Sequence, residues 1–166
     1  VAGTDAVVLL LATLANDASR AMVEDQLPSA RPIRKGAERI DDIFSLFDEI
    51  AYEKGAAVIR MFEHHVGQDV FRAGMRAYIA AHAGSTATSK DFLDAIQKAA
   101  ENPDFSAAFE TFLDQPGVPL ISLSLSCEGA PRVTLEQRRY VPTGAIVEGD
   151  AHWQVPVCMR FPAASG

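Results

Sequence analysis

The sequence predicts a mainly α-helical protein that ends in a small antiparallel β segment. Apolar residues recur every three or four positions from about residue 5 to residue 116, which is the spacing of one helix face. After Gly117 they alternate with polar residues, as in a half-buried strand. Of the 166 residues, 48% are hydrophobic and 22% charged, so the chain has enough apolar material for a folded core. We therefore predict a helical part over residues 1–116 and a β part over residues 117–166.

The first three predicted helices are bounded by residues that favour the start or the end of a helix. Asp5 can cap a helix over residues 6–16. A second, short helix has its apolar face in residues 40–47. Asp48 is placed to cap a third helix, which ends at Gly67.

Three further helices follow. Thr88 and Asp91 resemble a capping box with Asp in place of Glu, and they mark the start of the second of these helices. The third contains the apolar residues of 105–113, and Gln115-Pro116-Gly117 ends it.

The β part contains at least three predicted strands, over residues 120–125, 133–137 and 153–161. A sheet this small leaves a face and two edges uncovered, so it must pack on the helices, on more chain or on a partner. Cys127 and Cys158 lie in these strand-like runs. They form neither a CxxC pair nor a dense disulfide framework, and we expect buried free thiols.

Charge and hydropathy exclude two classes of partner. The formal net charge of -7 and the pI near 5.0 argue against nucleic acid, whose binding needs a clustered basic excess. The apolar run 7–12 is too short to span a bilayer and lacks the basic flank of a signal peptide, so we expect no membrane span. The sequence leaves the compartment open, with the cytoplasm as the first expectation.

Metal ligands are not evident among the four histidines. His64 and His65 are adjacent, so on a helix their side chains point about 100° apart and cannot clasp one ion together. Neither His-Glu-x-x-His nor the reversed His-x-x-Glu-His occurs in the sequence. No Gly-x-Ser-x-Gly elbow and no phosphate-binding glycine loop occurs either. We therefore predict no metal ligand in this chain, and these patterns alone name no function.

An ordered series of segments nevertheless resembles the aminopeptidase N family of gluzincins, which are zinc metallopeptidases. The segments are Arg31-Pro32-Ile33-Arg34, residues 47–56 with Tyr52-Glu53-Lys54-Gly55-Ala56, residues 58–61, Gly67-Gln68-Asp69 with Phe71, Gly74 and Tyr78, Thr88 with Asp91-Phe92, residues 109–119, residues 137–140 and residues 153–157. The resemblance covers nearly the whole chain and is weakest over the first sixteen residues. It implies that residues 1–116 are the helical part of a thermolysin-like catalytic domain. Residues 117–166 would then begin a β-sandwich domain.

The resemblance also implies an activity and a role for one residue. Such enzymes remove N-terminal residues from peptides with a zinc-bound water, and negative charge develops on the scissile carbonyl oxygen. By the match of its motif, Tyr52 is the tyrosine whose hydroxyl stabilises that charge. The alternative is a half-buried aromatic residue at a helix start with its hydroxyl in water. We expect Glu53 at the start of the helix and Lys54 on its surface.

Other parts expected of such an enzyme do not occur in these residues. The His-Glu-x-x-His motif, a distal zinc-binding glutamate and the Gly-x-Met-Glu-Asn strand that anchors the substrate's amine are all missing. We therefore expect a fragment that needs the N-terminal part of the catalytic domain as its partner. Zinc and peptide substrates would bind only in the parent enzyme, and this chain alone would be inactive. The alternative is a non-catalytic helical scaffold or interaction module of the same fold.

Overall fold

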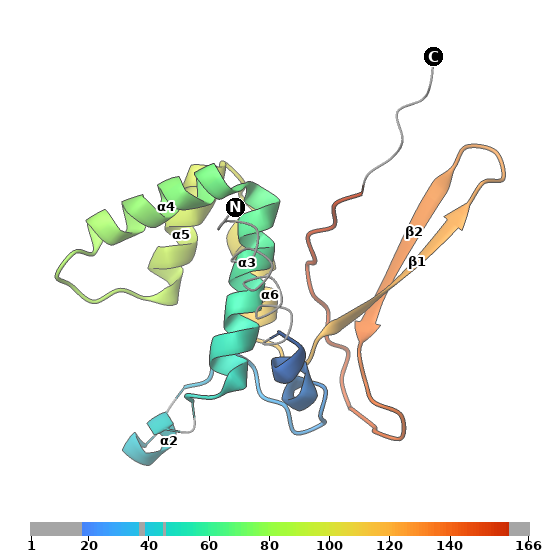
Figure 1. Cartoon of the computed structure of the whole chain (residues 1–166), viewed down its shortest axis with the longest axis horizontal. Coiled ribbons are helices and arrows are strands. Elements are labelled where there is room, and N and C mark those ends of the chain that lie inside the picture. Colours follow the sequence, from blue (N-terminus) through green and yellow to red (C-terminus); the bar gives the residue numbers. More distant parts are fainter. Residues whose placement is uncertain (1–17, 37–38, 45, 160–166) are drawn as a thin grey trace, which may run out of the picture. The chain divides into compact units, whose positions relative to one another are not determined.

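The structure is a computed structural model that describes residues 18–36, 39–44 and 46–159 (Figure 1). The helix predicted over residues 6–16 lies outside these ranges. By its internal contacts the chain forms two compact units, Val1–Val58 with Glu110–Trp153 and Ile59–Phe109 with Gln154–Gly166. The domain division predicted at residues 116 and 117 stays a prediction.

The first unit begins with short helical elements. Residues 18–25 are helical, and α2 (Ile40–Phe44) confirms the short second helix. A π-helical turn, η1 (Ile50–Lys54), then continues directly into α3 (Gly55–Val66). The helix predicted to follow Asp48 therefore exists, but it opens with a π turn that the apolar spacing does not predict.

The second unit contains two neighbouring helices, α4 (Gln68–Ala81) and α5 (Ser89–Ala100), which lie side by side (Figure 1). The predicted capping box is confirmed, because the Thr88 side chain accepts from the Asp91 N–H and the Asp91 side chain accepts from the Thr88 N–H. Gly74 on α4 allows a close approach to α5. A Cβ at this position would lie 2.9 Å from the Cα of Ile96.

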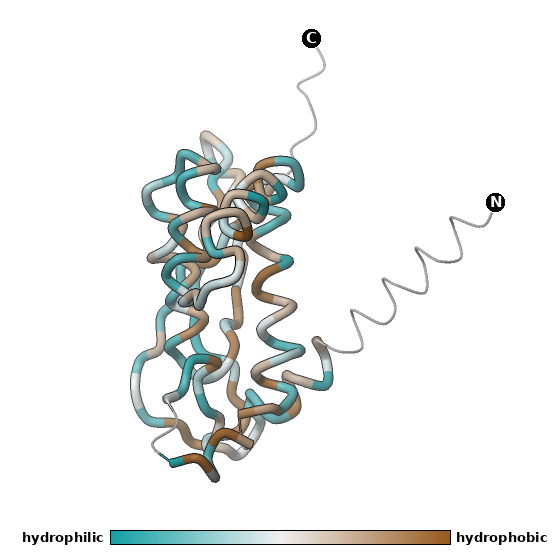
Figure 2. Tube along the Cα trace, turned by 90° about the vertical axis from the view of Figure 1, so that its left-hand side faces the viewer, coloured by the Kyte–Doolittle hydropathy of each residue, from teal (hydrophilic) through white to brown (hydrophobic). Residues whose placement is uncertain are grey.

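Aromatic rings form much of the core of the second unit. The ring of Phe62 on α3 lies 5.5 Å from that of Phe105 and 4.8 Å from that of Phe109, both on α6 (Phe105–Leu113). Figure 2 shows hydrophobic and hydrophilic residues interleaved along the helical turns, as amphipathic helices require.

The β part is a hairpin of β1 (Pro119–Ser126) and β2 (Arg132–Arg139), paired antiparallel. Leu123 lies opposite Leu135 and Leu125 opposite Val133, so these side chains share one face of the hairpin. Leu123 and Leu125 are each 61% exposed, so the described residues leave this apolar face largely open.

The third predicted strand is wrong for residues 153–159, which are not in a strand. The side-chain amide of Gln137 satisfies the backbone of Trp153 instead: its Oε1 accepts from the Trp153 N–H at 3.0 Å, and its Nε2 donates to the Trp153 carbonyl at 2.8 Å. A single side chain on β2 thus takes the place of a partner strand at this point.

Two further observations concern the surface. Cys127 and Cys158 are free and exposed, so the expectation of buried thiols is wrong. Within the described ranges no helix has both the length and the apolar character needed to cross a membrane.

Candidate functional site

Tyr52 lies in the middle of η1, with its side chain directed outward. The residue is 60% exposed. Its ring stacks on that of Phe47, with centroids 6.2 Å apart and planes at 28°. Among the described residues none hydrogen-bonds the Tyr52 hydroxyl, so this O–H is available to an incoming acceptor.

The N-terminal end of η1 is fixed by Asp48. Its Oδ1 accepts from the Ala51 N–H at 2.9 Å, and its backbone carbonyl accepts from the Tyr52 N–H at 3.1 Å. The guanidinium of Arg31 holds the same carboxylate through two hydrogen bonds, of 2.6 Å and 3.1 Å. Arg31 also donates to the carbonyls of Pro32 and Leu46. The Asp48 carboxylate is therefore held in a bidentate ion pair, which has a fixed geometry.

The C-terminal end of η1 is fixed by a buried ion pair. The Nζ of Lys54 lies 2.7 Å from Oδ2 of Asp25 and donates to the Gly117 carbonyl at 3.0 Å. The N–H of Gly117 donates to Oδ1 of Asp25 at 2.8 Å, which closes a ring of three residues. Lys54 is 5% exposed and Asp25 0%, so the expectation that Lys54 lies on the helix surface is wrong. Burial lowers the pKa of Lys54 below its ordinary value, and the charge of Asp25 opposes that shift.

Gly117 is the backbone anchor of this ring, and only glycine suits the position. Its φ of +91° lies in the region that side chains disfavour, and a Cβ would collide with the guanidinium of Arg139. The Arg139 side chain donates in turn to the carbonyl of Leu27 at 3.1 Å. Both the backbone conformation of Gly117 and the nearby Arg139 side chain therefore require a glycine at this position.

The catalytic role of Tyr52 stays a prediction from its motif, and sequence reasoning missed the contacts that Asp25 and Arg31 make around η1. Asp25 lies in the polar run Glu24-Asp25-Gln26, which is typical of a solvent-exposed face. No local signal marks it as buried, because its partners Lys54 and Gly117 are distant in sequence.

The carboxylates flanking Tyr52 are each in contact with an arginine. Arg20 lies 3.2 Å from the carboxylate of Glu49 and 3.4 Å from that of Glu53, while Arg31 pairs with Asp48. The exposed Tyr52 hydroxyl is therefore carried on a turn whose neighbouring carboxylates are each paired with an arginine.

The described residues do not fit a zinc site. No group of three or more His, Cys, Asp or Glu residues among them could hold a metal ion. His64 and His65 are both exposed on α3, and the buried Asp25 is engaged by Lys54.

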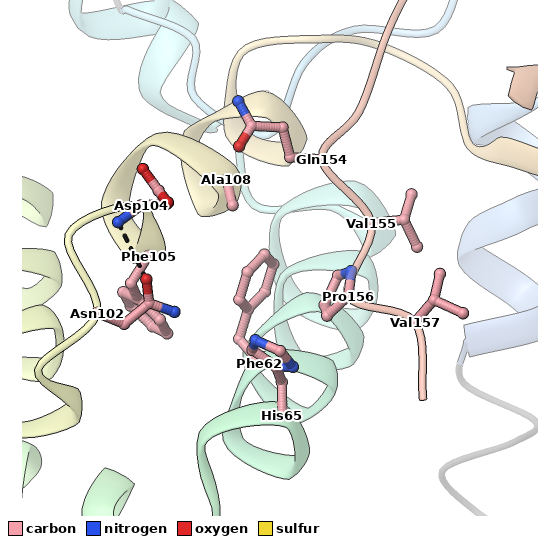
Figure 3. Close-up of a pocket in the computed structure, with 10 residues that line it drawn as sticks. All are labelled: Phe62, His65, Asn102, Asp104, Phe105, Ala108, Gln154, Val155, Pro156 and Val157. Carbon is pink, nitrogen blue, oxygen red and sulfur yellow. Dashed lines mark hydrogen bonds between the residues drawn. The ribbon is translucent and has the colours of Figure 1, made fainter. Parts of the chain in front are cut away.

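A pocket of about 350 Å³ lies in the second unit, and Tyr52 is not part of it. Figure 3 shows the lining side chains coming from α3, from α6 and the turn before it, and from residues 154–157. Asn102 already accepts from the Asp104 N–H at 3.0 Å through its Oδ1. His65 is the one imidazole in the described lining, and no serine, threonine, cysteine or lysine accompanies it. The pocket therefore offers no hydroxyl, thiol or amine nucleophile beside a histidine.

Comparisons with known proteins agree with one another. Residues 4–113 match the model of the peptidase family M1 domain. Aminopeptidase M1-A of Oryza sativa subsp. japonica is 32% identical over 135 residues, which make up 81% of this chain and 15% of the relative. Leucyl aminopeptidase of Saccharolobus solfataricus is 31% identical over 145 residues, covering 87% of this chain and 18% of the relative.

A third relative, glutamyl aminopeptidase of Bitis rhinoceros, is 29% identical over 144 residues, covering 87% of this chain and 15% of the relative. The chain thus spans less than a fifth of the length of these three relatives. Their names specify different residues, leucyl and glutamyl, and so indicate no common preference.

Proposed function

This chain belongs to the peptidase M1 family, and from that premise we propose that it supplies a catalytic tyrosine, Tyr52, to an aminopeptidase. The enzyme removes N-terminal residues from peptides. Tyr52 donates a hydrogen bond to the scissile carbonyl oxygen, and this bond strengthens as negative charge develops there.

The position of Tyr52 is the observation that carries the proposal. A donor stabilises a transition state best when it is fixed before the reaction begins and needs no rearrangement. Tyr52 is exposed on a turn whose two ends are held by Asp48 and Lys54. Its hydroxyl has no acceptor among the described residues, so it loses no internal hydrogen bond when a substrate binds.

The metal ligands and the anchor for the substrate's amine belong, in this proposal, to residues outside this chain. The described residues offer no zinc site, whereas the relatives are more than five times as long as the matched segment. The chain's own contribution is one oriented hydroxyl. The partner that completes the site is the remainder of the catalytic domain.

Substitution of Tyr52 tests the proposal in the longer protein that contains this chain. Tyr52→Phe removes the hydroxyl and keeps the ring, so kcat falls on the order of 100 to 1000-fold while KM changes little. Tyr78→Phe is the matched control, because it removes a hydroxyl from a half-buried ring on α4. Steady-state kinetics on a peptide substrate measure kcat and KM for the two variants. A near-normal kcat for Tyr52→Phe rejects the role.

A further inference from the structure

Lys54 is the feature near Tyr52 that the proposed function leaves unexplained. Burying an ammonium and a carboxylate is unfavourable unless both are paired, and apolar residues of similar volume often give equal or greater stability. Lys54 and Asp25 are nevertheless almost completely buried. Stability alone is therefore a weak reason for this pair. The directed hydrogen bonds that both side chains make to Gly117 are something apolar residues cannot provide.

We propose that Lys54 and Asp25 are positioning residues that hold the π-helical turn against Gly117 and thereby set the place of the Tyr52 hydroxyl. This inference rests on the proposed function of Tyr52. Neither residue is assigned contact with the substrate, and both act through the backbone of η1.

The geometry of η1 supports this assignment. Tyr52 is the middle residue of the five in η1 and Lys54 is the last. Side chains two positions apart on a helical turn point away from each other. The inward-pointing Lys54 can therefore fix the turn while the outward-pointing Tyr52 stays exposed, at 5% and 60% exposure respectively.

The anchor at the other side of the ring is the backbone of Gly117. Gly117 has a positive φ and packs against Arg139, and both of its backbone polar groups are engaged by the pair. Loss of the pair would remove the side-chain contacts that hold the C-terminal end of η1 against Gly117. A misplacement of about 1 Å at a reacting centre lowers the rate on the order of 100-fold.

The test is a double-mutant cycle in the longer protein. Lys54→Met should lower kcat on the order of 100-fold with little change in KM. The same substitution in the Tyr52→Phe background should have almost no further effect on kcat, because the hydroxyl it positions is absent. A role in folding alone would give equal losses in both backgrounds. Lys90→Met, on the exposed face of α5, is the control lysine and should leave kcat unchanged in both backgrounds.

A second variant separates positioning from folding. Lys54→Met leaves Asp25 buried without its partner, which can itself unfold the protein. The double substitution Lys54→Met with Asp25→Leu removes both charges at similar volume, so the fold should survive while the bonds to Gly117 are lost. The inference predicts a folded enzyme, by thermal melting, with kcat lowered to the level of Lys54→Met. A folded double variant with normal kcat overturns it, and so does unfolding of both variants, because the pair would then serve folding alone.

The outcomes also separate this inference from the function on which it rests. A near-normal kcat for Tyr52→Phe rejects the role of Tyr52, whatever Lys54→Met does. A large loss for Tyr52→Phe together with normal kcat for the folded Lys54 variants keeps the tyrosine and rejects the positioning pair.

Discussion

Tyr52 and Lys54 lie two residues apart in the chain and in opposite environments. One side chain is exposed with a hydroxyl available for a hydrogen bond, and the other is buried with a paired charge. The contrast follows from the helical turn that carries both, because it directs them to opposite sides. At the scale of single residues, the candidate site is therefore an exposed donor supported from inside by an ion pair.

Asp91 provides a test of a different local interaction. Hydrogen bonds from the Thr88 side chain and backbone lower the pKa of the Asp91 carboxyl below its ordinary value. The folded state then binds fewer protons than the unfolded state at pH values between the folded and the unfolded pKa, so this contribution to stability is full above the unfolded pKa. It is lost as the pH falls through the folded pKa.

We predict that Thr88→Val raises the pKa of Asp91, because the side-chain hydrogen bond is its largest cause. An NMR titration of the Asp91 carboxyl carbon measures this pKa in the wild type and in the variant. Thr86→Val, two residues earlier and outside the capping box, should leave the titration unchanged. Identical Asp91 titrations in the wild type and Thr88→Val would contradict the capping arrangement.

At the scale of elements, two glycines in helices should respond oppositely to the same substitution. Alanine is favoured over glycine in a helix by up to about 1 kcal/mol. At Gly55 an added Cβ meets nothing within 4 Å, so Gly55→Ala should stabilise the protein. At Gly74 the Cβ would lie 2.7 Å from Cδ1 and 2.9 Å from Cα of Ile96, so Gly74→Ala should force α4 and α5 apart.

We expect Gly74→Ala to destabilise by about 1–3 kcal/mol, as overpacking does. Denaturant unfolding of both variants and the wild type measures whether each substitution raises or lowers the free energy of unfolding. Equal stabilisation by the two alanines would mean that α4 and α5 do not approach as closely as described.

The same elements indicate what the sequence could predict. The capping box at Thr88 and the helix over residues 105–113 depend on neighbours in sequence, and both are confirmed. The third strand was wrong because Gln137, sixteen residues earlier, binds the Trp153 backbone, and local alternation carries no signal of that contact. The burial of Lys54 was missed for the same reason, since Asp25 and Gly117 are remote in sequence. In the candidate site, Tyr52 was predicted from its motif, whereas the residues that hold the turn around it are evident only in the fold.

At the scale of the whole molecule, the described residues contain Tyr52, the proposed donor, and no group of three or more His, Cys, Asp or Glu residues among them could hold a metal ion. We predict that the chain of 166 residues, prepared alone, binds no stoichiometric zinc and does not hydrolyse an aminoacyl anilide. Metal analysis and a chromogenic assay measure these two properties. Stoichiometric zinc with turnover would require a complete active site within this chain and would contradict the proposed division of the site.

The central claim is that the Tyr52 hydroxyl stabilises the transition state more than the bound substrate. The most direct measurement compares the affinity of the longer protein, with and without Tyr52→Phe, for two inhibitors. One is a tetrahedral phosphonate analogue of the peptide and the other an uncleaved substrate analogue. If Tyr52 has this role, Tyr52→Phe weakens binding of the phosphonate on the order of 100-fold and leaves that of the substrate analogue nearly unchanged. Equal changes in the two affinities would contradict it.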